Sequence, residues 1–252
     1  MDKAARAVAY QQAYLDDYDF EQVQVAQRQR CVLDVLRRLA PRRIVEVGCG
    51  IDPLFRRALE AGIGFERWIV VEPGERFIAA ARAAAGADPR FRAQDGFFED
   101  VAERLLGEEG PADMVLLSGL LNEIAEPGVI VAAARRMAGA RGIVHVNVPN
   151  ALSMHRRLAR AMGLIADERT LTARNLALKQ FHVFDPASLG ALVEAAGLRV
   201  TESGGFFVKP FTHGQMSRIR DVLTPEILDG LWTLGRELPE LASEIYVNAV
   251  AR

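Results

Sequence analysis

Short apolar runs rich in β-branched residues alternate with amphipathic segments along most of the chain, with glycine and proline between them. The amphipathic segments predict helices at 54–61, 75–85, 98–106 and 127–138. The apolar runs predict seven strands, at 44–47, 68–71, 90–93, 114–117, 143–148, 198–202 and 244–250. The pattern predicts an α/β fold: a doubly wound, mostly parallel seven-stranded sheet with helices on both faces and ligands beyond the carboxyl ends of its strands.

At 252 residues, the chain is expected to be a single domain. Its four parts are an N-terminal helical cap (1–40), a ligand-binding core (41–150), a mostly helical insertion over the mouth of the site (151–180) and the C-terminal part of the sheet (181–252). The insertion stands out because thirty residues between two strands exceed an ordinary connection. We expect it to recognise the substrate.

The stretch RIVEVGCGID at residues 43–52 predicts a strand, a glycine turn and a helix. Gly48, Cys49 and Gly50 form the turn, where the lack of side chains lets a ligand approach the backbone. Glu72 follows at the end of the second strand, beside Pro73, and can accept hydrogen bonds from both hydroxyls of a ribose. This spacing predicts a ligand with an adenosine-like group.

The same stretch argues against a dinucleotide. Asp52 stands at the start of the following helix, where it would repel a pyrophosphate, and the third glycine of the dinucleotide pattern is missing. Glu46, before the turn, suits a ligand with a cationic amino group.

Four motifs in this order carry a family resemblance: VEVGCGID, VVEPGERF, QDGFFED and DMVLLSGLLNEI. They resemble the successive motifs of class I S-adenosylmethionine-dependent methyltransferases, well over residues 43–150 and weakly from there to the C-terminus. The chain departs from many members at Asp52, where they have a third glycine. The resemblance implies a Rossmann-like methyltransferase fold with an antiparallel last strand. It also implies S-adenosylmethionine as cofactor and S-adenosylhomocysteine as product.

Further cofactor contacts are expected beyond the third and fourth strands. Asp95, with Gly96, either accepts a hydrogen bond from the amino group of the adenine or caps the next helix. Phe97 would lie against the adenine ring. Ser118 follows the fourth strand, near the reactive sulfonium.

The acceptor site is expected at the next strand ends. Asn122 and Glu123 either contact the acceptor, with Glu123 as a candidate base, or cap a helix. Asn147 and Asn150 lie near the carboxyl end of the fifth strand, where substrate would bind.

Two outlying elements extend this prediction. The tyrosines at 10, 14 and 18 either pack on the sheet or form a lid from which Tyr14 contacts the acceptor. Arg156, in a basic cluster at 155–160, either binds an anionic acceptor such as a phosphate or lies on a solvated face.

The reaction expected is methyl transfer to an oxygen or nitrogen of a small biosynthetic intermediate. A hydroxyl acceptor needs a base, and histidine suits that role near neutral pH. His182 and His155 are the candidates, whereas His145, deep in a strand, is expected to be structural.

Composition narrows the classes of function. With 31 basic and 33 acidic residues, the chain shows no sign of nucleic-acid binding. We expect no metal site, since ligand spacings are lacking, and no membrane span; a cytoplasmic enzyme is the default. The long connection at 204–241 is expected to help form either a homodimer or the acceptor pocket. An NAD-dependent oxidoreductase and a non-catalytic methyltransferase-like scaffold subunit remain as alternatives.

Overall fold

The computed structural model describes residues 20–252. Tyr10, Tyr14 and Tyr18, and with them the predicted tyrosine lid, lie outside the described residues. The strands are β1 (Arg43–Val47), β2 (Arg67–Glu72), β3 (Phe91–Asp95), β4 (Met114–Ser118), β5 (Ile143–Pro149), β6 (Leu198–Phe206) and β7 (Glu244–Ala251).

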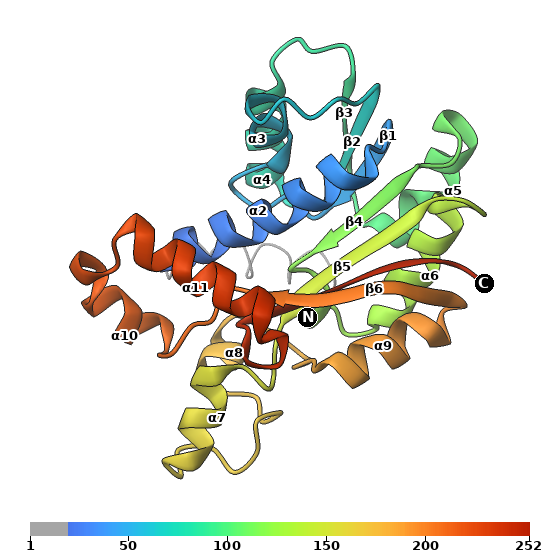
Figure 1. Cartoon of the computed structure of the whole chain (residues 1–252). Helices are drawn as coiled ribbons and strands as arrows, with labels where there is room; N and C mark the ends of the chain where they lie inside the picture. Colours follow the sequence, from blue (N-terminus) through green and yellow to red (C-terminus); the bar gives the residue numbers. More distant parts are fainter. Residues whose placement is uncertain (1–19) are drawn as a thin grey trace.

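These strands form one seven-stranded sheet in the order β3-β2-β1-β4-β5-β7-β6 (Figure 1). The first five pair in parallel, and β7 runs antiparallel to both β5 and β6. The predicted doubly wound, mostly parallel fold is therefore confirmed. Because the chain reverses its winding direction at β1 and β4, their carboxyl ends splay apart and open a crevice for ligands.

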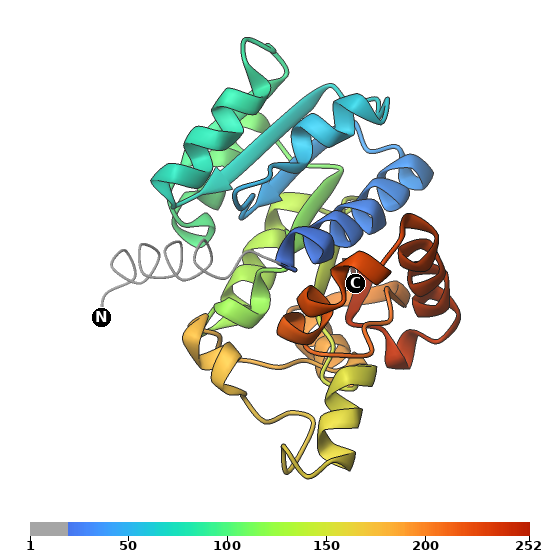
Figure 2. The same ribbon diagram turned by 90° about the vertical axis from the view of Figure 1, so that its left-hand side faces the viewer.

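Helices cover both faces of the sheet (Figures 1 and 2). Their bounds are α2 (Glu21–Leu39), α3 (Leu54–Glu60), α4 (Glu75–Ala85), α5 (Phe98–Glu109), α6 (Pro127–Ala138), α7 (Met154–Ala161), α8 (Ala173–Ala177), α9 (Pro186–Ala195), α10 (His213–Arg218) and α11 (Pro225–Glu237). The helix predicted at 98–106 continues to Glu109, so Gly107 does not end it.

Alternating residues of the strands supply two separate cores. In β1, Val45 and Val47 pack with α5, α6 and α9, whereas Ile44 faces the core beneath α2, α3 and α4. This period of two explains why the strands are apolar on both faces, as expected for a parallel sheet covered by helices on each side. A third core, which includes Phe206 and Trp232, joins α2, α11 and the end of β6.

The insertion differs from the prediction. Of residues 151–180, only α7 and α8 are helical, and an irregular loop joins them. Arg156 holds that loop: its guanidinium donates to the carbonyl oxygens of Glu168, at 2.6 Å, and Thr170. We expected these carbonyl oxygens to accept hydrogen bonds within a helix. They accept them instead from the buried guanidinium of Arg156.

Within residues 20–252, no helix combines the length and apolarity needed to cross a bilayer. The same residues contain no group of three or more histidine, cysteine or acidic side chains able to hold a metal ion.

Candidate active site

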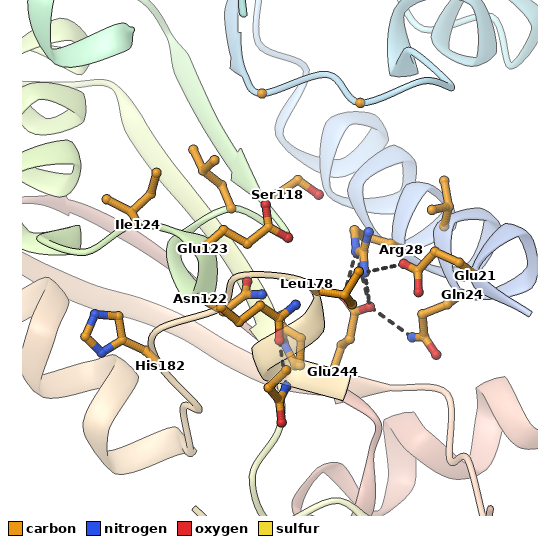
Figure 3. Close-up of a pocket in the computed structure, with 18 of the residues that line it drawn as sticks. Glu21, Gln24, Arg28, Ser118, Asn122, Glu123, Ile124, Leu178, His182 and Glu244 are labelled. Carbon is orange, nitrogen blue, oxygen red and sulfur yellow. Dashed lines mark hydrogen bonds and ion pairs between the residues drawn. The ribbon is translucent and has the colours of Figure 1, made fainter. Parts of the chain in front are cut away.

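A cavity of about 960 Å³ lies at the carboxyl ends of β1, β2 and β4. Its walls come from the glycine turn after β1, from α2, from the insertion and from the segment after β6 (Figure 3). Ligand pockets usually have volumes of about 300–1,000 Å³, so this one is large enough for a nucleoside and a second small molecule. The cavity brings most of the predicted site residues together.

The turn after β1 needs its glycines for two different reasons. Gly48 and Gly50 have φ values of +75° and +61°, which residues with a Cβ rarely adopt. At Gly48 a Cβ would also lie 3.3 Å from the Leu120 side chain. Gln29 of α2 donates to the backbone oxygen of Asp52 at 2.6 Å, which fastens the far end of the turn to α2. The turn is therefore held in place and forms one wall of the cavity, where its glycines have no side chains to cover the backbone.

Glu72 lines the cavity at the end of β2 and is only 6% exposed. Its carboxylate accepts hydrogen bonds from the backbone N–H of Gly74, at 2.7 Å, and of Cys49, at 3.2 Å. Burial raises the pKa of Glu72 to about 7, against the effect of these donors. Its carboxylate is therefore held in place at a cavity wall, as a ribose-binding group requires.

Glu46 is buried in β1 and also reaches the cavity. The indole N–H of Trp68 donates to Glu46 Oε2 at 2.9 Å. Burial raises the pKa of Glu46 to about 7. A cationic group of a ligand would supply the counter-charge that this carboxylate lacks in the described part of the chain.

Of the residues at the end of β3 and just beyond it, some line the cavity and others lie at the surface. Phe97 lines the cavity, whereas Asp95 and Gly96 are not among its lining residues. The Asp95 side chain is exposed and forms an ion pair with Arg82. The structure therefore brings Phe97, but not Asp95, to the predicted cofactor site.

At the ends of β4 and β5, the two predicted asparagines play different parts. Asn147 is fully buried beneath the cavity, where its Oδ1 accepts from Gly119 N at 2.8 Å and from Ser118 Oγ at 3.1 Å. It therefore shapes the turn after β4. Asn150 lines the cavity, but its side-chain amide bonds to Ala242 O and Leu152 N.

Ser118, Asn122 and Glu123 all line the cavity. Asn122 is 3% exposed, and its Oδ1 has no hydrogen-bond partner within residues 20–252. Its backbone oxygen accepts from the N–H groups of Phe181 and His182. These bonds hold the backbone of Asn122 beside the cavity, while its side-chain oxygen is buried.

The histidines fall into different environments. His155 and His182 both line the cavity; His182 Nε2 lies 3.1 Å from Ala125 O. His155 Nδ1 is buried with no hydrogen-bond partner among the described residues, and burial lowers the pKa of this histidine. His145 is fully buried, with Nδ1 2.7 Å from Asn248 Oδ1, as expected of a structural histidine.

Arg156 also lines the cavity, but its guanidinium is largely used within the insertion, by the carbonyl bonds described above and by Asn175 Oδ1 at 3.5 Å. The predicted anion-binding role of Arg156 therefore competes with a structural one.

The wall opposite the glycine turn is polar, and its side chains were not predicted from the sequence. Arg28 of α2 forms an ion pair with Glu244 of β7, and Gln24 Nε2 donates to the same carboxylate at 2.9 Å (Figure 3). Next to them, His213 Nε2 lies 3.0 Å from Glu21 Oε2, and His213 Nδ1 lies 2.7 Å from Lys209 Nζ. These residues come from α2, α10, β7 and the segment after β6, so no local pattern could have joined them.

Residues 24–203 match a family model described as a methyltransferase domain. A comparison with curated protein sequences finds no match.

Three solved structures are similar to the chain. A Mesorhizobium loti S-adenosylmethionine-dependent methyltransferase is 16% identical over 86% of this chain and 96% of its own, with a TM-score of 0.56. The plantazolicin methyltransferase BamL was solved with a triazolic desmethylPZN analog and S-adenosylhomocysteine. It is 11% identical over 98% of this chain and 97% of its own, with a TM-score of 0.57. The O-methyltransferase NcsB1 from neocarzinostatin biosynthesis was solved with S-adenosylmethionine and 2-hydroxy-5-methyl naphthoic acid. It is 18% identical over 85% of this chain and 50% of its own, with a TM-score of 0.50.

These identities are low, so the structural likeness shows the fold. The family model, in contrast, matches the sequence over more than half of the chain. The seven-stranded sheet fits the Rossmann-like fold of this family, and the glycine turn and the buried Glu72 line the cavity at its strand ends. The chain belongs to the S-adenosylmethionine-dependent methyltransferase family, and S-adenosylmethionine is its cofactor.

Proposed function

We propose that this protein transfers a methyl group from S-adenosylmethionine to an oxygen or nitrogen atom of a small, anionic acceptor. The observation that carries the proposal is the continuous cavity, which has the glycine turn and Glu72 on one wall and the polar side chains of α2, the insertion and β7 on another. Both ligands could then lie in the same cavity, where alignment supplies much of the rate enhancement.

The residues at the cofactor end fit S-adenosylmethionine. Glu72 offers carboxylate oxygens to the ribose hydroxyls, Phe97 an aromatic edge to the adenine, and Glu46 a negative charge to the amino group of the methionine part. When bound, the cofactor supplies an activated methyl group on a sulfonium. The protein contributes by holding the acceptor in line with that group and by excluding water.

The size and charge of the other end favour a small anionic acceptor. Arg28, Arg174 and Lys179 line it, although Glu21 and Glu244 offset part of their charge. NcsB1, solved with a hydroxylated naphthoic acid, is a neighbour that binds a small aromatic acid. Asn122 and Glu123 line the cavity, and we expect them to orient the acceptor. The homodimer and the cytoplasmic location expected from the sequence stay predictions.

The test begins with calorimetric titration of S-adenosylhomocysteine and NAD into the wild type, Glu72→Ala and the control Glu75→Ala. Glu75 is an exposed carboxylate three residues away, outside the cavity. We expect micromolar binding of S-adenosylhomocysteine, about −8 kcal/mol, that Glu72→Ala loses and Glu75→Ala keeps.

The second step is transfer of tritium from methyl-labelled S-adenosylmethionine to a panel of small phenols, hydroxy acids and amines. Labelled product from a hydroxy acid or phenol would support the proposal. Cofactor binding with no transfer to any member would favour the scaffold alternative, and binding of NAD alone would contradict the proposal.

A further inference from the structure

Lys209 is an unusual residue in this chain. The sequence has only three lysines, at 3, 179 and 209, among 31 basic residues, and arginine supplies the rest. Lys209 follows β6, is 3% exposed and lines the cavity. Within residues 20–252, its Nζ has one hydrogen-bond partner, His213 Nδ1, at 2.7 Å. Arginine cannot act as a base near neutral pH, whereas a buried lysine can.

The contacts of His213 determine how Lys209 is used. Burial alone would raise the pKa of Glu21. The hydrogen bond from His213 and the charge of Arg28 outweigh burial and lower this pKa to about 2. An ionised carboxylate can only accept, so the proton of neutral His213 is on Nε2 and is donated to Glu21. His213 Nδ1 is then an acceptor, and Lys209 Nζ must donate to it.

Because Lys209 is the donor to His213, its amine can still receive a proton. A neutral Lys209 that donates one N–H to His213 keeps its lone pair, and the cavity is the open space beside it. If Lys209 gains a proton, the ammonium is hydrogen-bonded to a histidine whose other nitrogen is held by the Glu21 carboxylate. The chain of three side chains can thus stabilise the positive charge that forms, as a carboxylate does behind a catalytic histidine.

The charges around Lys209 nearly balance. Glu21 and Glu244 favour the ammonium, Arg174 and Arg28 oppose it, and burial is the largest influence, so that the pKa of Lys209 falls to about 7. His213 and His155 also face Lys209, and burial lowers the pKa of each, so both are expected to be neutral at pH 7.

We propose that Lys209 is the general base of the methyl transfer, and that His213 and Glu21 position it and stabilise its protonated form. The proposal rests on the methyltransferase function and concerns its reaction with hydroxyl acceptors. Lys209 Nζ takes the proton of the acceptor O–H, the oxygen electron pair forms the new bond to the methyl carbon, and the electrons of the broken carbon–sulfur bond remain on sulfur. The sequence points instead to His182, His155 and Glu123 as candidate bases.

The first test measures Lys209 directly and needs no acceptor. The full chain is labelled with ε-¹³C lysine, saturated with S-adenosylhomocysteine and titrated by NMR; its three lysines give three signals, and Lys209→Arg identifies one of them. We expect this signal to titrate near pH 7. Glu21→Gln removes a negative charge that favours the ammonium, so its midpoint should fall, whereas the control Asp229→Asn, on the exposed side of α11, should not change it.

The second test separates a base from a positive anchor for an anionic acceptor. Lys209→Arg supplies a permanent positive charge but cannot accept a proton, and Lys209→Met can neither carry a charge nor accept a proton while keeping the length of the side chain. With any phenol or hydroxy acid methylated by the wild type, both variants should lose about 100-fold or more in kcat, with unchanged affinity for S-adenosylhomocysteine. The kcat of the wild type should rise with pH through about 7, and in Glu21→Gln this rise should move to lower pH.

Different failures identify different errors. If S-adenosylhomocysteine does not bind the wild type, the proposed function is wrong. If it binds but the Lys209 signal titrates together with those of the other two lysines, Lys209 is not the base. Wild-type turnover in Lys209→Arg would equally overturn the inference and make Lys209 an anchor. Thermal melting of Lys209→Met shows whether a loss of activity reflects unfolding.

Discussion

Arg28 and Glu244 lie 216 residues apart in sequence and form a two-point ion pair across the cavity wall, with Nε 2.9 Å from Oε2 and Nη2 2.6 Å from Oε1 (Figure 3). Glu244 is 1% exposed and opens β7, whereas Arg28 belongs to α2. The pair fastens α2 to β7. It therefore helps to fix the wall that we assign to the acceptor.

Removing one partner of this pair should destabilise the fold strongly. Arg28→Met leaves the Glu244 carboxylate buried without its ion pair, and we expect the free energy of unfolding to fall by about 3–5 kcal/mol. The matched control is Arg42→Met, whose pair with Glu66 is more than half exposed on both sides and should contribute less than about 1 kcal/mol. Urea denaturation measures both changes. Equal losses in the two variants would show that the buried pair contributes no more than a surface pair.

Two glycines of α11 should respond oppositely to alanine. A Cβ at Gly235 would lie 2.2 Å from Phe207 N and 2.6 Å from Phe206 C, because the helix packs directly on the backbone after β6. Gly235→Ala should therefore displace α11 and cost more than about 2 kcal/mol. Gly230, in the same helix, has open space, so Gly230→Ala should stabilise by up to about 1 kcal/mol. The melting temperatures of the two variants give the comparison, and a stable Gly235→Ala would contradict the observed packing.

Cofactor binding should depend on pH through Glu72 and Glu46. Burial raises the pKa of each from 4.5 to about 7, so the folded protein keeps protons that the unfolded chain has released, and the stabilisation from these carboxyls is lost as pH rises from about 4.5 to 7. Ribose hydroxyls and a ligand ammonium favour the ionised forms. Binding of S-adenosylhomocysteine should therefore release protons near pH 6, and affinity should rise by up to about tenfold per pH unit below 7 for each proton released.

Calorimetry at pH 6 in two buffers with different ionisation enthalpies measures this proton release. Glu72→Gln should reduce both the release and the pH dependence of affinity. Identical heats in both buffers would show that neither carboxyl changes its ionisation on binding.

Trp68 should report the ionisation of Glu46 by fluorescence. The chain has two tryptophans, and Trp68 is fully buried with its indole N–H bonded to Glu46. In Trp232→Phe, Trp68 is the only tryptophan, and its emission under tryptophan-selective excitation should change near pH 7 as the adjacent carboxyl gains or loses its charge. Adding Glu46→Gln should abolish that change. If it persists in the double variant, another group near Trp68 must titrate instead.

Local patterns in the sequence predicted most of the sheet. The strands and their order along the chain follow from apolar β-branched runs, and the cofactor end follows from the glycines at 48 and 50 with Glu72 at the next strand end. These features depend on residues close together in sequence or on a fixed spacing between adjacent strands. β6 was predicted to end at 202 but continues to Phe206, because antiparallel pairing with β7 extends it through Gly204 and Gly205.

The acceptor end could not be predicted in the same way. The insertion is held by side-chain bonds of Arg156 to backbone carbonyls, and Asp95, which fits the order of the motifs, pairs with Arg82 outside the cavity lining. Both outcomes depend on where a side chain finds a partner, which spacing does not encode.

The sequence by itself determined the fold, the family resemblance and the cofactor, because hydrophobic periodicity and a short turn motif are local properties of the chain. Only the tertiary structure brought Glu21, His213 and Lys209 together, from segments up to 192 residues apart. Their chemistry arises from burial and from hydrogen bonds between elements that meet only in the folded chain. A lysine becomes a candidate base only when its surroundings remove water and supply a histidine and a carboxylate, and those surroundings belong to the folded chain.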